Sequence, residues 1–469
     1  MIADDPTIAG PAADELLFLP LGGLGEIGMN LALFGHNGAW LMVDIGITFG
    51  GEAFPEYEVM MADPAFIVAR RQRLAGIVLT HAHEDHLGAL PYLWKRLKSP
   101  IYATPFTALL ARSKLARAGL DAAPVHEIPL RGRFRCGPFS LEYLSMTHSI
   151  PEPNALLIET PVGTLLHTGD WKLDDDPVIG GGYDKPRLQA VGRGPLLAML
   201  CDSTNAVVPG RTGSEGGLFE PLLEAVRAAP GRVLVTAFAS NIARLVTLAR
   251  VAFTAGRRFG VVGQAMERML AAARAAGYWP TDLPPLVDER HLGYLPSEEL
   301  MAVCTGSQGE PRSALARIAA RQHRHIELDV RDLVIFSSRV IPGNERPVER
   351  VQQRLRDIGV DLLTDDDAPI HVSGHPAEDD LRRLYDWVQP PVVIPVHGTP
   401  RHLQANAAIA ASCHVPRVAS VSNGELCRLT PDGPAPVAVV EHGRLVATAS
   451  GGLEPVPSAE LERMRRRER

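Results

Sequence analysis

The sequence predicts an α/β fold, and two observations support this prediction. Short apolar runs, such as Leu196–Leu200, Arg232–Thr236 and Leu300–Cys304, end in small or polar residues and lead into stretches with the composition of a helix. Strands that alternate with helices in this way are typical of a parallel sheet covered by helices. In addition, 469 residues are too many for one ordinary hydrophobic core, so two or three domains are expected.

The N-terminal part of the chain predicts a hairpin rather than a nucleotide-binding turn. A strand over residues 16–20 leads into a glycine-rich turn, in which Gly23, Gly25 and Gly28 have the spacing of a dinucleotide-binding motif. That motif requires a helix after the turn, whereas residues 29–34 and 39–43 alternate like two strands joined by a tight turn. We therefore expect the glycines to allow the backbone to approach a functional site closely.

The next strand, residues 76–80, leads into a cluster of candidate metal ligands. His81, His83, Asp85 and His86 form an H-x-H-x-D-H pattern on what reads as a strand-to-helix turn. Imidazole and carboxylate together suit zinc or manganese, and the lack of cysteine argues against a closed structural zinc site. Three histidines and an aspartate within six residues are too concentrated for a solvated loop, so a catalytic metal site is expected.

Three more candidates also lie at or just beyond the ends of expected strands. Asp44 ends residues 39–43 and would orient a metal-bound imidazole, whereas alone it would be an ordinary turn residue. His148 and Asp170 follow expected strands over residues 141–146 and 164–168, and Asp170 is placed to bridge two ions. His167, inside its strand, is expected to be a core or supporting histidine.

The C-terminal half supplies further polar residues at strand ends. Ser240 and Asn241 follow the strand that ends at Thr236, where backbone N–H groups at a helix start bind phosphate, although an ordinary helix cap explains each one singly. Residues 369–372 are expected to form a strand that carries the motif His371-Val372-Ser373-Gly374-His375. A later strand, residues 391–396, leads to His397.

The composition argues against a membrane-spanning protein and excludes few other classes of protein. The net charge is −7, which is unlike a strongly basic nucleic-acid-binding domain but is compatible with a local basic channel. No apolar run is long enough to cross a bilayer, and the acidic N-terminus lacks the basic start of a signal peptide. Five scattered cysteines without a C-x-x-C pair indicate a reducing compartment, so a cytoplasmic location is expected.

Taken in order, these motifs resemble the β-CASP branch of the metallo-β-lactamase superfamily, and within it the ribonuclease J family. The H-x-H-x-D-H motif indicates the superfamily, and the His371–His375 motif followed by His397 narrows it to nucleic-acid processing. The segments Gly25–Asn30 and Phe238–Asn241 are most similar to ribonuclease J, and the resemblance extends from Leu19 to about Gly424.

The resemblance implies a metallo-β-lactamase αββα sandwich with an inserted β-CASP parallel α/β domain. The expected domain limits are residues 1–205 and 366–445 for the two parts of the sandwich, residues 206–365 for the insertion and residues 446–469 for a charged linker or tail. Family members continue into a C-terminal domain of roughly a hundred residues, a size typical of small domains, and this chain is expected to lack it.

The resemblance also implies roles for the candidate residues. Two divalent ions, with Zn²⁺ favoured over Mn²⁺, would be held by His81, His83 and His148 and by Asp85, His86 and His397, with Asp170 bridging them. Asp44 would support a ligand, and His375 would act with the metal ligands Asp85 and Asp170 in catalysis, at the leaving oxygen. A pocket for a 5′-monophosphate would be formed by Ser240, Asn241, His371 and Ser373.

The implied activity is a metal-dependent ribonuclease that degrades single-stranded RNA from 5′ to 3′, starting at a 5′-monophosphate, with endonuclease activity, in RNA processing and decay. The partners implied are single-stranded RNA, a second copy in a homodimer and an RNA-degradation complex. Two alternatives stay open: a β-CASP endonuclease or DNase, and an RNA-binding scaffold paralogue that does not cut. The intact ligand set argues against the scaffold.

Overall fold

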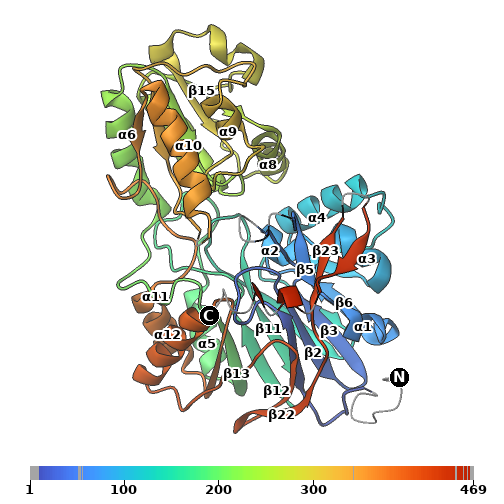
Figure 1. Ribbon diagram of the computed structural model, residues 1–469. Helices are drawn as coiled ribbons and strands as arrows, with labels where there is room; N and C mark the ends of the chain where they lie inside the picture. Colours follow the sequence, from blue (N-terminus) through green and yellow to red (C-terminus); the bar gives the residue numbers. More distant parts are fainter. Residues whose placement is uncertain are drawn as a thin grey trace.

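The computed structural model describes residues 10–50, 54, 56–341, 343–448, 451–457, 459–461 and 463–464. Figure 1 shows a lower body built around long sheets and an upper domain that contains β15 and α6, α8, α9 and α10. The chain crosses from the lower body to the upper domain after β13 (Leu196–Asp202) and returns after β18 (Asp361–Leu363).

The lower body contains two large sheets. The first sheet has eight strands in the order β22-β21-β1-β2-β3-β6-β7-β8. The strands are β1 (Leu17–Gly22), β2 (Leu31–His36), β3 (Ala39–Val43), β6 (Leu74–Val78), β7 (Ile101–Ala103), β8 (Val125–Glu127), β21 (Glu425–Thr430) and β22 (Gly433–Val439). The second sheet has seven strands in the order β20-β19-β13-β12-β11-β10-β9. The other strands are β9 (Arg133–Cys136), β10 (Phe139–Ser145), β11 (Asn154–Thr160), β12 (Gly163–His167), β19 (Val392–Val396) and β20 (Arg417–Val418).

The two sheets pack face to face, with helices on both outer faces. Phe18 and Phe34 of the first sheet share one core with Leu141 and Leu156 of the second. The opposite face of the first sheet packs on α1 (Ala65–Val68), α3 (Leu90–Leu97) and α4 (Pro105–Arg117), and η2 (Arg71–Arg73) directly precedes β6. The opposite face of the second sheet packs on α5 (Lys185–Gly192), α11 (Glu378–Val388) and α12 (Pro400–Ser412). The order helix, sheet, sheet, helix is the expected αββα sandwich.

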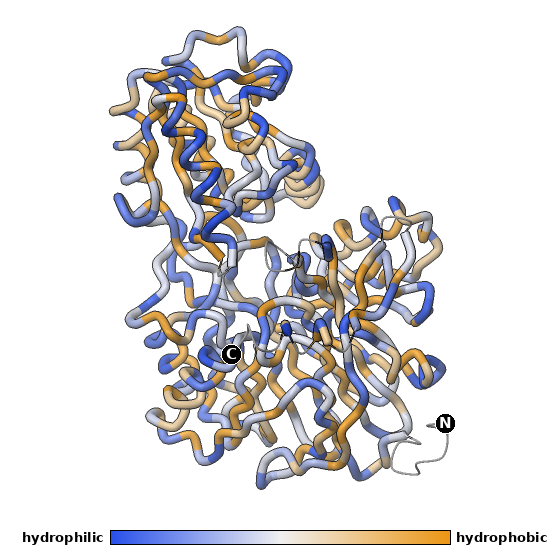
Figure 2. Tube along the Cα trace, in the orientation of Figure 1, coloured by the Kyte–Doolittle hydropathy of each residue, from blue (hydrophilic) through white to orange (hydrophobic). Residues whose placement is uncertain are grey.

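Both faces of the central strands are apolar because each sheet is covered on both sides there. In β1, Leu17 and Leu19 point into the core beneath α3 and α4, while Phe18 points between the sheets. A period-two alternation therefore appears as a continuous apolar run. Figure 2 shows this pattern as mainly hydrophobic strands within the lower body and many hydrophilic residues on the peripheral helices.

The upper domain is a parallel sheet of five strands in the order β15-β16-β14-β17-β18. The strands other than β18 are β14 (Val233–Thr236), β15 (Arg258–Val262), β16 (Leu300–Cys304) and β17 (Leu333–Phe336). Its helices are η3 (Glu215–Leu218), α6 (Phe219–Ala228), α7 (Ile242–Thr254), α8 (Gln264–Ala275), η4 (Glu289–Tyr294), η5 (Ser297–Glu299), α9 (Ala314–Ala319) and α10 (Glu345–Ile358). The expected parallel α/β insertion is thus confirmed as a fold, while its exact limits stay a prediction.

The N-terminal hairpin is confirmed, because β2 and β3 pair antiparallel around a turn at Asn37 and Gly38. A fourth, small sheet has the order β24-β23-β5-β4, with β4 (Ile47–Thr48), β5 (Met60–Ala62), β23 (Arg444–Ala447) and β24 (Leu453–Pro455). Part of the segment 446–469 is therefore folded, and Val446, Val456 and Met464 are buried against Met60.

The prediction of a strand over residues 369–372 is wrong. This segment has no partner strand among the described residues, because it is where the chain crosses back to the sandwich. The carbonyl of Ile370 instead accepts a hydrogen bond from the Ser337 hydroxyl at 2.7 Å. Among the described residues, no helix is long and apolar enough to cross a membrane.

Candidate metal centre and phosphate pocket

The H-x-H-x-D-H motif lies at the end of β6, where the chain turns into α2 (Glu84–Leu87). His81 and His83 stand in the turn, and the one-turn helix brings Asp85 and His86 to the same side. The helix begins close against the glycine-rich hairpin, since a Cβ on Gly46 would lie 1.7 Å from the carbonyl oxygen of Asp85. Gly46 permits this close approach, whereas the approach expected of Gly23, Gly25 and Gly28 stays a prediction.

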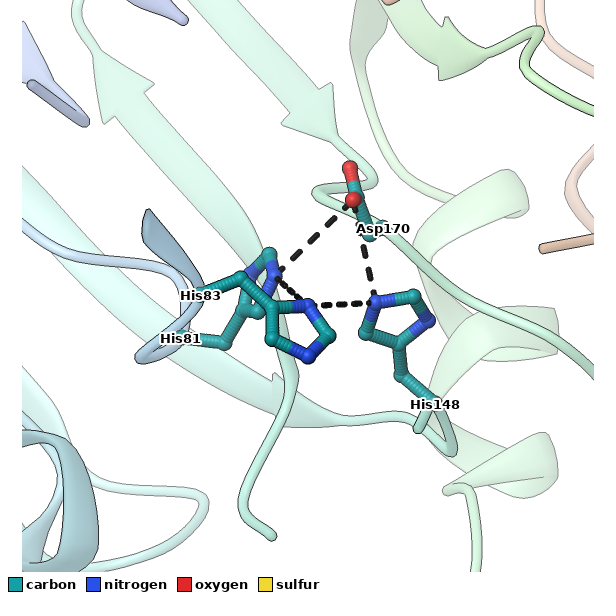
Figure 3. Close-up of side chains that lie close together, drawn as sticks. All are labelled: His81, His83, His148 and Asp170. Carbon is teal, nitrogen blue, oxygen red and sulfur yellow. Dashed lines mark hydrogen bonds and ion pairs between the residues drawn. The ribbon is translucent and has the colours of Figure 1, made fainter. Parts of the chain in front are cut away.

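The first group of converging side chains consists of His81, His83, His148 and Asp170 (Figure 3). His83 Nδ1 lies 3.1 Å from His81 Nε2 and 3.0 Å from His148 Nε2. The Asp170 carboxylate lies 3.8 Å from both His81 and His148. Burial, together with the neighbouring imidazoles, lowers the pKa of His81 and His148 well below the usual value, and burial lowers that of His83 to about 4. These rings are therefore neutral and have lone pairs for a cation.

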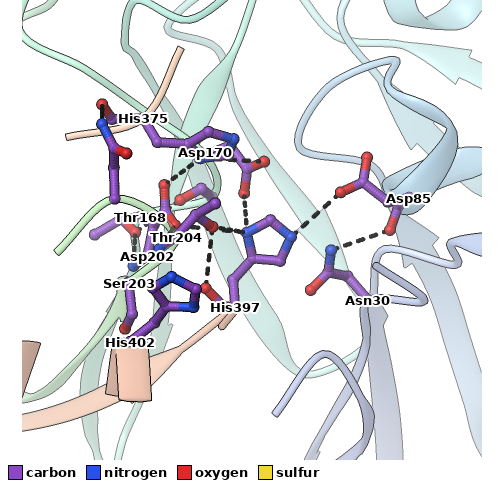
Figure 4. A network of polar contacts seen from close by, with 12 residues as sticks. Asn30, Asp85, Thr168, Asp170, Asp202, Ser203, Thr204, His375, His397 and His402 are labelled. Carbon is purple, nitrogen blue, oxygen red and sulfur yellow. Dashed lines mark hydrogen bonds and ion pairs between the residues drawn. The ribbon is translucent and has the colours of Figure 1, made fainter. Parts of the chain in front are cut away.

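The second group consists of Asp85, His86, Asp170 and His397, the last three of them buried. His397 Nε2 lies 3.2 Å from Asp85 Oδ2, and His397 Nδ1 lies 3.4 Å from Asp170 Oδ1 (Figure 4). His86 Nε2 lies 3.2 Å from Asp170 Oδ2. Although burial opposes the charge, the adjacent carboxylates raise the pKa of His397 to about 10 and that of His86 well above the usual value. Asp170 belongs to both groups.

These residues fit two divalent cations. Neutral imidazoles and carboxylates are the donors that such ions take, and within each group the ligand atoms lie within 4.8 Å of one another. In the second group a cation would displace the protons that the adjacent carboxylates favour on His86 and His397. Several of the nitrogens face each other at hydrogen-bond distance, an arrangement in which a cation replaces shared protons.

Asp44 supports the candidate ligand His86 by contacting the ring nitrogen that faces away from Asp170. It follows β3 with a left-handed φ of 62°, a conformation that costs free energy and persists where the surroundings enforce it. One carboxylate oxygen lies 2.7 Å from His86 Nδ1, and the other accepts a hydrogen bond from the Thr80 amide at 2.8 Å. This contact orients His86, which leaves its Nε2 facing Asp170.

Asp202 belongs to the site although the sequence analysis assigned it no role. It ends β13 and is fully buried, and its Oδ2 lies 2.8 Å from His375 Nδ1. Although burial opposes protonation, Asp202 raises the pKa of His375. Asp202, His375, His397 and Asp170 form a third group of converging polar atoms. The signal was its position at a strand end, the same as for Asp44 and Asp170.

The four candidate pocket residues lie in different surroundings. The Ser240 hydroxyl, from the upper domain, lies 3.1 Å from His83 Nε2 and so reaches the metal centre. Asn241 is occupied: its carbonyl oxygen caps α7 at Arg244 N, and its amide donates to Glu215. The Ser373 hydroxyl accepts from the His375 amide at 3.2 Å. Burial and the Arg244 charge lower the pKa of His371 to about 3.

Gly374 packs directly against the His148 ring, which explains why the His371–His375 motif has a glycine at this position. Its carbonyl oxygen lies 2.5 Å from His148 Nδ1, so it holds that ring. A Cβ at this position would lie 2.6 Å from the same nitrogen. The segment that carries Ser373 and His375 can therefore lie directly on the metal centre.

Comparison with known families gives matches over most of the chain. The metallo-β-lactamase superfamily matches residues 26–196, the description "Ribonuclease J, beta-CASP domain" matches residues 230–355, and the description "Zn-dependent metallo-hydrolase RNA specificity domain" matches residues 368–412. The second range begins after α6 and ends within α10 of the upper domain, and the third contains Ser373, His375 and His397.

Among curated proteins, the ribonuclease J of Sinorhizobium meliloti is 41% identical over 459 residues, which span 96% of this chain and 81% of that protein. The ribonuclease J of Mycolicibacterium smegmatis is 42% identical over 84% of this chain and 71% of its own length. A crystal structure of a protein of unknown function from Enterococcus faecalis aligns with a TM-score of 0.61 at 16% identity, over 88% of this chain and all of that one. This last likeness shows the fold alone.

Proposed function

Because the chain belongs to the ribonuclease J family, we propose that it is a metal-dependent ribonuclease that degrades single-stranded RNA from 5′ to 3′. It starts at a 5′-monophosphate end, also cleaves internally, and acts in RNA processing and decay. The observation that carries the proposal is the contact of Ser240 with His83, 3.1 Å apart, which brings a residue of the upper domain to the buried ligand cluster. A phosphate held between the two domains would lie beside the metals.

In this proposal His81, His83 and His148 hold one ion, Asp85, His86 and His397 hold the other, and Asp170 bridges them. Zn²⁺ is favoured because most of the ligands are imidazoles, and Mn²⁺ is the alternative. Divalent ions bound there lower the pKa of an attacking water and neutralise charge on the phosphate.

His375 supplies the proton in this proposal. Asp202 accepts from its Nδ1, which fixes the ring and favours the protonated form. Nε2–H is then free to stabilise or protonate the oxygen that leaves when the phosphodiester breaks.

The pocket beside this centre discriminates RNA ends. A terminal phosphate carries more charge and more acceptor oxygens than an internal one, so donors from Ser240, His371 and Ser373 favour it. Asn241 contributes by capping α7, since its side chain is already engaged with Arg244 and Glu215. The RNA backbone would run between the two domains, with its bases loosely held.

The domain limits given above, a homodimer, an RNA-degradation complex and a cytoplasmic location belong to the same proposal. The last agrees with the five free thiols of the chain.

The test compares matched single-stranded RNAs with a 5′-monophosphate, 5′-triphosphate or 5′-hydroxyl, labelled at either end, with Zn²⁺ or Mn²⁺ added to the metal-free protein. Immediate release of mononucleotide from the 5′ label, fastest for the monophosphate, supports the proposal. Discrete internal fragments independent of the end indicate an endonuclease instead. Cleavage of matched DNA at the same rate argues for a general nuclease, and metal binding without cleavage argues for a scaffold.

A further inference from the structure

Arg244 is an arginine of α7 that is only 1% exposed. Its Nε and Nη2 donate to the two oxygens of Glu215, at 3.0 Å each. Its Nη1 donates to the carbonyl and hydroxyl of Ser337, at 2.9 and 2.6 Å. Burying a guanidinium is costly unless nearly every N–H has an acceptor, and here the acceptors are supplied.

Arg244 and Glu215 form a buried ion pair, and its contacts involve both segments that connect the two domains. Glu215 lies on the way up from the sandwich, just before α6. The carbonyl oxygen of Ile370 and His371 Nδ1, on the way back, lie 3.5 and 3.4 Å from Arg244 Nη1. Ser337 follows β17 of the upper domain. One planar guanidinium therefore fixes three segments that are distant in sequence.

Two of the candidate pocket residues touch this pair directly. Asn241 donates to Glu215 at 2.9 Å, and His371 faces Arg244. Ser240 precedes Asn241, and Ser373 lies two residues after His371. Arg244 itself is buried and faces these partners, so it acts through them rather than on RNA.

A separate series of hydrogen bonds leads from the Glu215 backbone towards the metal ligand His148. The Glu215 amide donates to Asp174 at 3.0 Å, and Asp174 pairs with buried Lys172. Lys172 in turn pairs through its backbone with Thr147, the residue before the ligand His148. These bonds do not use the Glu215 or Arg244 side chains, so this support of His148 stays in place when either side chain is changed. The other contact of the His148 ring, with the Gly374 carbonyl, lies on the crossing segment, so bound metal is measured on every variant.

We propose that Arg244 and Glu215 are positioning residues for the 5′-phosphate pocket: they set the discrimination between RNA ends, and cleavage itself does not require them. This inference rests on the proposed function, because it assigns a part of the same site. Arginine is needed at this place because lysine cannot donate to a carboxylate and to the Ser337 carbonyl in one plane.

The experiment measures kcat and KM of the full chain on RNA with a 5′-monophosphate and on RNA with a 5′-hydroxyl. Arg244→Lys and Glu215→Gln are each expected to lower kcat/KM on the monophosphate RNA by about tenfold or more, the loss of one or two charge-assisted hydrogen bonds. Rates on the hydroxyl RNA are expected to change by less than about twofold. Ser337→Ala removes one acceptor with little change of volume and is expected to give a smaller loss in the same direction.

Arg257→Lys is the matched control. Arg257 is also a buried arginine of the upper domain, but it donates to the carbonyls of Gly231 and Ala229, both at 2.6 Å, away from the pocket. It is expected to lower the melting temperature without changing the ratio of the two rates. Ellipticity and bound metal, measured on every variant, separate misfolding from loss of discrimination.

An unchanged ratio in folded Arg244→Lys, Glu215→Gln and Ser337→Ala would overturn the inference and leave the proposed function standing. A fall of both rates together, with the ratio kept, would also overturn it. Equal rates of the unmodified protein on the two RNAs would refute end discrimination in the proposed function, and the inference with it.

Discussion

The metal cluster and the phosphate pocket are built in different ways. The residues of the cluster lie on the turns that follow strands of the sandwich, as His81 does after β6 and His397 after β19, or on the one-turn helix α2. The proposed pocket instead takes Ser240 from the upper domain and His371 and Ser373 from the crossing segment. The strands of a packed sheet and the contact of His148 with Gly374 fix the first site, whereas in our proposal a buried ion pair between segments fixes the second. The cluster should therefore tolerate changes between the domains that the pocket does not.

The substitution expected to disrupt the cluster most is Asp170→Asn, since Asp170 belongs to all three groups of converging ligands. An amide removes the negative charge that faces five histidines, so both ions should be lost or weakened. We expect metal content to fall and RNA cleavage to drop by more than the roughly 100-fold that loss of a residue supporting a ligand costs. Inductively coupled plasma mass spectrometry and cleavage rates give the result. Full metal content with full activity would remove Asp170 from the site.

Asp44→Asn tests the support of the cluster without removing a ligand. The carboxylate accepts from Thr80 and faces His86, and an amide at that place would present a donor to one of them. Metal affinity is expected to fall by about 10- to 100-fold, with activity restored by excess metal. Competition with a fluorescent chelator measures the affinity. If excess Zn²⁺ and Mn²⁺ both fail to restore activity, Asp44 does more than orient His86.

The same contrast explains what the sequence could predict. His81, His83, Asp85 and His86 were found because their ligand types crowd into one turn, and the strands before them are plainly apolar. Asp202 was missed because a single aspartate at a strand end looks like a helix cap until His375 is beside it. Arg244 gave no signal, since an arginine in a helix usually faces solvent and the partners of its side chain are 29 to 127 residues away.

The prediction of a strand over residues 369–372 was wrong for a related reason. Their apolar character reflects burial, which the sequence shows, but not the kind of partner that satisfies the backbone. That partner is a set of side chains, Ser337 and Arg244, and not a neighbouring strand. Patterns within a short window thus predict the sandwich and its cluster, while the junction between domains depends on long-range contacts.

Ser373→Ala probes the pocket alone. The hydroxyl accepts from the His375 amide, and in the proposed function it also donates to the terminal phosphate. Loss of one hydrogen bond of about 1 kcal/mol should lower kcat/KM on 5′-monophosphate RNA by about fivefold, with the 5′-hydroxyl RNA and the metal content unchanged. The two RNAs measured side by side give the ratio. A parallel fall on both substrates would place Ser373 in the chemistry and not in end recognition.

The smallest expected effect concerns a second contact between the domains, which does not involve Arg244. Glu152, with a left-handed φ of 57°, accepts from the Phe106 amide at 2.8 Å and from the Tyr278 hydroxyl of the upper domain at 2.9 Å. Burial raises the pKa of Glu152 despite these bonds. The folded protein therefore binds this proton more tightly than the unfolded chain. Stability from this group is present below the unfolded value of 4.5 and is lost as pH rises through the folded value.

Glu152→Gln removes that dependence, because an amide cannot ionise and still offers an acceptor to the Phe106 amide. With metal removed by a chelator, the variant is expected to melt above the unmodified protein at pH 7, by no more than about 2–4 °C, which corresponds to roughly 1 kcal/mol in a domain of this size. The difference should shrink at pH 4, below the unfolded value of 4.5, where the carboxyl is mostly protonated in both states. Tyr278→Phe, which removes a donor to the carboxylate, should shift melting in the opposite direction at pH 7. A Glu152→Gln variant that melts lower by the same amount at both pH values would mean that this contact stabilises the domain junction by geometry and not by its charge state.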